Sequence, residues 1–100
     1  MDRMICIKVH KGQDDTILAA CDEEILGQTF KGDGMRITVS ERFYNDEIVS
    51  EETFIEFMEK VTIMNLVGER VIALAIEKGH VSEDNVLDIG GVKHAQVVKL

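Results

Sequence analysis

The chain is poor in cysteine and has no long hydrophobic run. Its 100 residues include two cysteines, too few for the disulfide framework of a small secreted domain. No hydrophobic run approaches the roughly 20 residues of a membrane-spanning helix, and the first residues do not resemble a signal peptide. No repeat, linker or low-complexity segment is present. These absences predict a reduced, cytoplasmic protein without membrane contact and with a single domain, residues 1–100.

Motifs for metal binding and catalysis are also missing. Cys6, Cys21, His10 and His94 have the side-chain chemistry of soft metal ligands, but they form no C-x-x-C or paired ligand motif. We therefore expect no metal site, no cofactor and no catalytic residue, and we interpret both cysteines as buried structural residues. The acidic residues directly after Cys21 disfavour a reactive thiolate, although a helix beginning there would favour one.

The net charge is −8 and is unevenly distributed. Residues 13–60 carry thirteen acidic and four basic side chains, whereas residues 1–12 have a net charge of +2. The overall charge disfavours non-specific binding of nucleic acid. Basic and histidine residues lie towards the two ends of the sequence, where we expect a partner to bind.

Periodic hydrophobic residues predict the secondary structure. Alternation predicts strands at residues 4–10, 16–21, 35–40 and 94–99, the first two joined in a hairpin. Helical spacing predicts helices at residues 51–60 and 63–78. One continuous helix would be roughly 40 Å long, so we expect a break near residues 61–62. We interpret residues 41–49 as a loop anchored by aromatic side chains.

These elements predict an α+β fold, a two-layer α/β sandwich. Its sheet is mainly antiparallel, with the helices packed on one face. In the predicted core, one face of the second helix packs against the first strand; the residues are Met64, Val71, Leu74 and Ala75 of the helix and Ile5, Ile7 and Val9 of the strand.

Several short segments together resemble one protein family. They are Val9-His10, residues 20–24 with Leu26-Gly27 and Phe30, residues 65–70 (Asn-Leu-Val-Gly-Glu-Arg), and residues 89–92 followed by 94–96. From Met4 to Leu100 the chain is similar to domain of unknown function family 424, a group of small archaeal proteins. The resemblance implies a cytoplasmic archaeal protein with an α/β sandwich and no established activity, and it suggests a link to translation.

Two polar segments are the candidate binding sites. In the first, Asn65, Glu69 and Arg70 would form a recognition patch on the predicted second helix, because residues four apart share a helix face. The alternative is structural: Gly68 permits close packing and the polar groups satisfy local partners. In the second segment, the backbone N–H groups of Gly90 and Gly91 would bind a phosphate. The alternative there is a bend or β-bulge before the last strand.

Two classes of function remain open. The first is a non-catalytic binding module for RNA, a ribonucleoprotein or a protein partner. The second is a small-molecule or nucleotide-binding enzyme that uses the Gly90-Gly91 loop. The missing catalytic motifs favour the first. If the first and last strands are neighbours, Lys8, His10, Lys93 and His94 would converge at one sheet edge, and protonated histidines would strengthen phosphate binding there.

Overall fold

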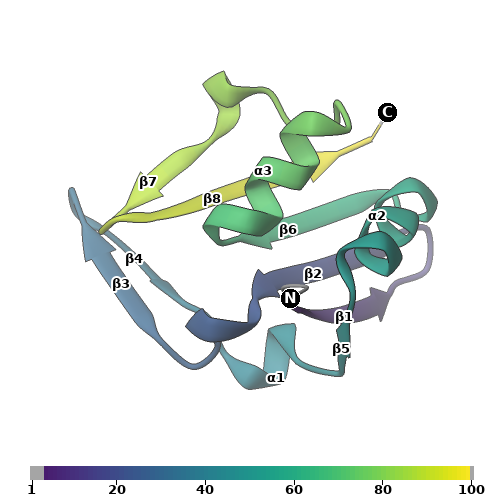
Figure 1. The fold of residues 1–100 in the computed structure, drawn as a ribbon, viewed down its shortest axis with the longest axis horizontal. Helices are drawn as coiled ribbons and strands as arrows, with labels where there is room; N and C mark the ends of the chain where they lie inside the picture. The colour runs from purple at the N-terminus through teal and green to yellow at the C-terminus, as the bar shows by residue number, and fades with distance from the viewer. Residues whose placement is uncertain (1–3, 100) are drawn as a thin grey trace.

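The computed structural model describes residues 4–99, which form a six-stranded sheet and a separate two-stranded sheet (Figure 1). The strand order in the larger sheet is β5-β1-β2-β6-β8-β7, and only the β2–β6 pair is parallel. The strands are β1 (Ile5–Lys11), β2 (Thr16–Asp22), β5 (Glu47–Val49), β6 (Ile63–Val67), β7 (Leu87–Ile89) and β8 (Val92–Val98). The predicted α+β class and mainly antiparallel sheet are confirmed.

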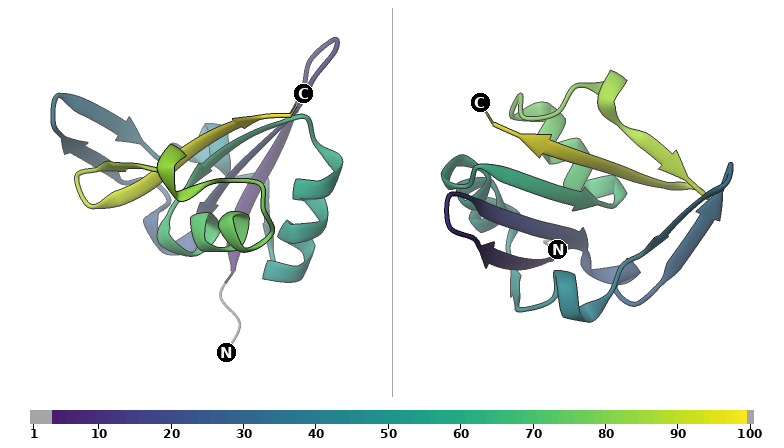
Figure 2. Two further views of the ribbon diagram at one scale, coloured as in Figure 1. Left: turned by 90° about the horizontal axis from the view of Figure 1, so that it is seen from above. Right: turned by 180° about the vertical axis from the view of Figure 1, so that it is seen from behind.

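Helices α2 (Glu51–Lys60) and α3 (Glu69–Glu77) pack on one face of the larger sheet. On the other face lie the short helix α1 (Glu41–Tyr44) and a hairpin of β3 (Thr29–Gly32) and β4 (Met35–Thr38). Figure 2 shows the β3–β4 hairpin projecting away from α2 and α3. The prediction of helices on one face therefore holds for α2 and α3 but not for α1.

Alternating side chains divide the core into two parts. Ile5 and Ile7 of β1 face α2 and α3, whereas Cys6 faces α1 and the β3–β4 hairpin. The predicted helix face is confirmed, because Val71, Leu74 and Ala75 belong to the same buried cluster as these two isoleucines. Met64 lies in that cluster too, but it belongs to a strand.

The prediction of a helix over residues 63–78 is wrong in its first third. Residues Ile63–Val67 form β6, and α3 begins only at Glu69. Gly68 separates the two elements with φ +121°, a conformation that side-chain-bearing residues rarely adopt. Apart from Asn65, the residues of β6 are apolar on both faces, as in a buried central strand, and such a run also satisfies helical spacing.

Two further expectations need correction. The strand predicted at 35–40 ends at Thr38, and it pairs with β3 in the smaller sheet instead of joining the main one. Residues 41–49, expected as a loop, form α1 and the edge strand β5. Phe43 and Tyr44 nevertheless anchor the segment as expected, by packing on the sheet. In the described part of the chain, no helix is long and apolar enough to cross a membrane.

Candidate functional site

A polar groove lies on the sheet face that α2 and α3 do not cover. One of its two cavities, which we call the main cavity because it contains Asn65, is about 320 Å³. Its polar lining comes from Arg36, Thr38, Ser40, Tyr44, Asn65, His94 and Gln96. A second cavity of about 580 Å³ shares His94 and Gln96 and extends to the 3-10 helix η2 (Glu83–Asn85). The β3–β4 hairpin, which we call the arm, forms one wall, whereas β6 and β8 form the floor.

The floor follows from strand register. Asn65 of β6 lies directly opposite Gln96 of β8, and Val67 lies opposite His94. Residues two apart on a strand share a face, so Asn65, His94 and Gln96 all point away from α2 and α3. Ala19 of β2 lies beside Asn65. Because its side chain is small, α1 can approach the sheet closely at this point.

Tyr44 of α1 fixes the orientation of the Asn65 amide. Its hydroxyl donates a hydrogen bond to Asn65 Oδ1 at 2.6 Å. Burial raises the pKa of Tyr44, so the phenol keeps its proton and remains a donor at neutral pH. Since Oδ1 is engaged by Tyr44, the amide nitrogen of Asn65 is the group that it offers as a donor to a ligand.

The imidazole of His94 is held by the neighbouring strand. Its Nδ1 donates to the backbone carbonyl of Leu66 at 3.0 Å, because a carbonyl oxygen can only accept. The pKa of His94 is lowered because the ring is buried. The hydrogen bond to the Leu66 carbonyl acts in the opposite direction but is weaker. The groove therefore contains a neutral histidine near pH 7.

The arm contacts the turn between β7 and β8 through glycine backbones. A Cβ at Gly32 would lie 2.6 Å from the Gly90 nitrogen, and a Cβ at Gly90 would collide with the Lys31 carbonyl. Gly90 and Gly91 are the two turn residues of the β7–β8 hairpin. The geometry of the glycine pair therefore favours the structural alternative. The two glycines form a tight turn between β7 and β8, not a β-bulge.

The geometry of the glycine pair gives little support to a phosphate loop. The N–H of Gly91 donates to Asp88 Oδ1 at 2.9 Å, so a carboxylate already occupies that donor. The backbone of Lys31 lies against Gly90. Lys93, the residue expected to add charge, forms an ion pair with Glu69 at 3.4 Å on the opposite side of the sheet.

Replacing Gly90 with alanine is expected to displace the arm. Gly91→Ala is the matched control, because Gly91 also has positive φ (+92°) but a Cβ there would meet no atom within 4 Å. Both changes introduce backbone strain of roughly 1–2 kcal/mol, yet only Gly90→Ala collides with the arm. Amide hydrogen exchange in residues 29–38 should accelerate in Gly90→Ala and stay near wild type in Gly91→Ala. Equal exchange in the two variants would contradict the contact.

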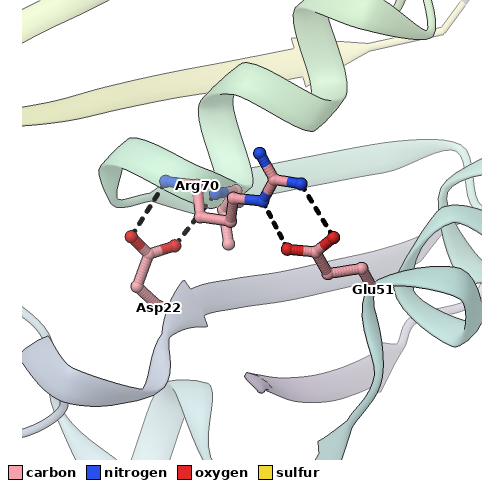
Figure 3. Close-up of polar contacts among 4 residues, drawn as sticks. Asp22, Glu51 and Arg70 are labelled. Atoms are coloured by element: carbon pink, nitrogen blue, oxygen red, sulfur yellow. Dashed lines mark hydrogen bonds and ion pairs between the residues drawn. The ribbon is translucent and has the colours of Figure 1, made fainter. Parts of the chain in front are cut away.

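The Gly68-Glu69-Arg70 segment is part of a structural network (Figure 3). The buried carboxylate of Asp22, at the end of β2, accepts hydrogen bonds from the N–H groups of Arg70 and Val71, each at 2.9 Å. The Arg70 guanidinium binds both carboxylate oxygens of Glu51. These contacts tie the start of α3 to β2 and α2. The patch predicted from Asn65 and Glu69 is wrong, because the two residues belong to different elements.

The remaining predicted residues do not converge. Strands β1 and β8 are separated by β2 and β6, so they are not neighbours. Lys8 donates to the carbonyl of Arg42 at 2.9 Å, and His10 stacks on Phe43 with ring centres 4.5 Å apart, both contacts being with α1. Lys8 and Lys93 lie on opposite faces of the sheet. The expectation of one basic edge is therefore wrong.

The two cysteines face each other across β1 and β2. Both are fully buried, and burial is the main cause that raises the pKa of each thiol. Such protonated thiols are poor nucleophiles. Within residues 4–99, no group of three or more His, Cys, Asp or Glu side chains is arranged to hold a metal ion.

Sequence reasoning identified two of the seven polar residues that line the main cavity, Asn65 and His94. It missed Arg36, Thr38, Ser40, Tyr44 and Gln96. Gln96 carried a usable signal, since it lies two residues after His94 in a predicted strand and so shares its face. The others belong to the arm, which contains Arg36 and Thr38, or to α1 with its N-cap, which contain Tyr44 and Ser40. The position of these elements over the sheet depends on long-range packing.

The comparisons with known proteins agree with this fold. A solved structure, described as the crystal structure of an uncharacterized conserved protein from Methanopyrus kandleri, is similar to this chain with a TM-score of 0.81 and 25% sequence identity. The similarity covers 97% of this chain and 94% of that protein. No curated protein matches. The family model described as "Protein of unknown function (DUF424)" matches residues 10–100, and the protein therefore belongs to this family.

Proposed function

We propose that this protein is a non-catalytic binding module and that its groove binds a segment of single-stranded RNA. The observation that carries the proposal is the groove floor, where Asn65, His94 and Gln96 offer neutral hydrogen-bonding groups on a sheet face left open by α2 and α3. Planar amide and imidazole groups suit the edges of unstacked bases, which proteins read in single-stranded RNA.

The charge of the groove favours recognition of RNA bases over attraction to RNA phosphates. Arg36 is the cationic group of the main cavity and Asp84 the anionic group of the second, so the groove has little net charge. Outside it, the protein is acidic. Non-specific binding of a polyanion is therefore suppressed, and affinity has to come from contacts that depend on the bases.

The shape of the groove supports an extended ligand. The two cavities share His94 and Gln96 in their linings, so they lie next to each other on β8 and together extend from the arm to η2. A cavity of about 320 Å³ would also accept a small molecule. For nucleophilic catalysis, however, a base should lie within hydrogen-bond reach of the nucleophile. The hydroxyl of Tyr44 donates its hydrogen bond to Asn65 and not to His94, so His94 does not act on it as a base. Both cysteine thiols are buried and lie outside the groove lining.

Binding should depend on the two amides of the floor. With fluorescently labelled single-stranded RNAs of randomised sequence, Asn65→Ala and Gln96→Ala should each weaken binding by about tenfold, which corresponds to about 1.4 kcal/mol. The matched control is Gln13→Ala, because Gln13 is exposed in the β1–β2 turn, away from the groove. Fluorescence anisotropy measures all three affinities.

The dependence of RNA affinity on ionic strength distinguishes recognition of bases from attraction to phosphates. Few phosphate contacts predict a shallow dependence of affinity on salt concentration. If no RNA binds, or if Gln13→Ala weakens binding as much as the floor variants do, the proposal is contradicted. Binding of a protein partner by the same face, without RNA, would also overturn it. The cytoplasmic location and the link to translation remain predictions.

A further inference from the structure

His94 is the one residue shared by both cavities whose hydrogen-bonding character is set by a fixed backbone partner. The Leu66 carbonyl requires Nδ1 to carry a hydrogen. In the neutral ring, Nε2 then has no hydrogen and can only accept a hydrogen bond. A ligand group that contacts Nε2 in this form must be a donor, such as the N–H of a base. A phosphate oxygen cannot meet this requirement.

The surroundings of His94 favour the neutral ring. Its neighbours in register are apolar, Val67 on β6 and Leu87 on β7. Charged and titratable groups face it from three other elements: Arg36 on β4 and Tyr44 on α1 across the main cavity, and Asp84 on η2 across the second. The Asp88 carboxylate on β7 is engaged with the Gly91 N–H.

We infer that His94 Nε2 recognises an N–H donor of an RNA base, and that protonation of His94 abolishes this contact and weakens binding. The inference rests on the proposed function, because it names the chemistry by which the groove would bind RNA. It reverses the expectation drawn from the sequence, in which protonated histidines strengthened binding to phosphate. The burial that lowers the pKa of His94 keeps the ring in its accepting form at neutral pH.

The direction of the pH effect separates the two chemistries. If Nε2 accepts from a base, affinity should fall when the pH is lowered from about 7.5 to about 5, by up to about tenfold for each pH unit below the pKa of His94 in the free protein, because the free protein takes up a proton that the complex excludes. If a phosphate oxygen lies there, the protonated ring donates to it and affinity rises. The same RNA pool can be used for both measurements.

Two substitutions at position 94 separate the two ring nitrogens. His94→Asn keeps an N–H group near the position of Nδ1 but removes the acceptor, so binding should be weak at both pH values. His94→Gln places an amide near the position of Nε2, so binding should be retained without the pH dependence. His80→Gln is the matched control, since His80 contacts Glu59 of α2, away from the groove.

The experiment measures RNA binding by wild type and these variants at both pH values, together with the ¹⁵N shifts of the His94 ring in the free protein. Weaker binding at low pH in wild type and His80→Gln, but not in His94→Gln, would support the inference. Stronger binding at low pH, a pH effect that persists in His94→Gln, or a ring with hydrogen on Nε2 would overturn it while the RNA-binding proposal stands. Absence of RNA binding at both pH values would overturn the proposed function and this inference with it.

Discussion

Asp22→Ala is expected to lower the free energy of unfolding by about 2–4 kcal/mol, because it leaves two backbone donors at the start of α3 without their acceptor. Asp22 is 4% exposed, so water cannot readily take the place of its carboxylate. A carboxylate at a helix N-terminus also interacts favourably with the helix dipole. Asp14→Ala is the matched control, since Asp14 is exposed in the β1–β2 turn. Urea unfolding gives the free energies.

A substitution at Gly68 also tests the contact between the Asp22 carboxylate and the start of α3. A Cβ at this position would lie 2.5 Å from Asp22 Cγ, so Gly68→Ala should destabilise the protein through both backbone strain and this collision. In the double variant with Asp22→Ala the collision is absent, and the combined loss should be smaller than the sum of the two single losses. Additive losses would show that the two residues act independently.

Leu74→Ala should lower the free energy of unfolding by about 2–5 kcal/mol, the usual range for removing a buried leucine side chain. Leu74 is 4% exposed and packs in the cluster between α3 and the sheet. Glu77→Ala on the same helix is the control, because Glu77 is exposed and should change stability by roughly 0.5 kcal/mol or less. A urea midpoint near wild type for Leu74→Ala would show that this helix face is assigned wrongly.

Local sequence signals predicted the elements that they directly encode. The hairpin of β1 and β2 follows from alternating residues on either side of Gly12, and α2 follows from Ser50, whose hydroxyl accepts from the Thr53 N–H at 3.2 Å. In each case the residue that specifies the element lies within or directly beside it, so no knowledge of distant contacts is needed.

Predictions failed where a residue acts on a distant element. Asp22 directly precedes a 3-10 helix, Glu23–Ile25, a position at which aspartate is typical of an N-cap, but its side chain makes no capping bond there. It accepts instead from Arg70 and Val71, 48 and 49 residues away in sequence. A carboxylate before a helix start is a local signal, whereas its use by another helix is decided by tertiary packing.

The groove was only partly accessible to sequence reasoning for the same reason. Asn65 was predicted as part of a recognition patch, but the assignment of β6 to a helix gave it the wrong neighbours. With β6 recognised as a strand, Asn65, His94 and Gln96 become candidates for one sheet face. The wall supplied by Tyr44 still depends on where α1 docks, and no residue pattern near Tyr44 specifies that position.

The most direct test of the groove as the binding site is an NMR titration of the ¹⁵N-labelled protein with single-stranded RNA. The groove predicts that the largest shift changes occur in the side-chain amides of Asn65 and Gln96 and in the backbone around Tyr44 and His94. Resonances of α2 and α3 should stay nearly unchanged. Shift changes concentrated on α2 and α3, with the groove resonances unmoved, would contradict the account.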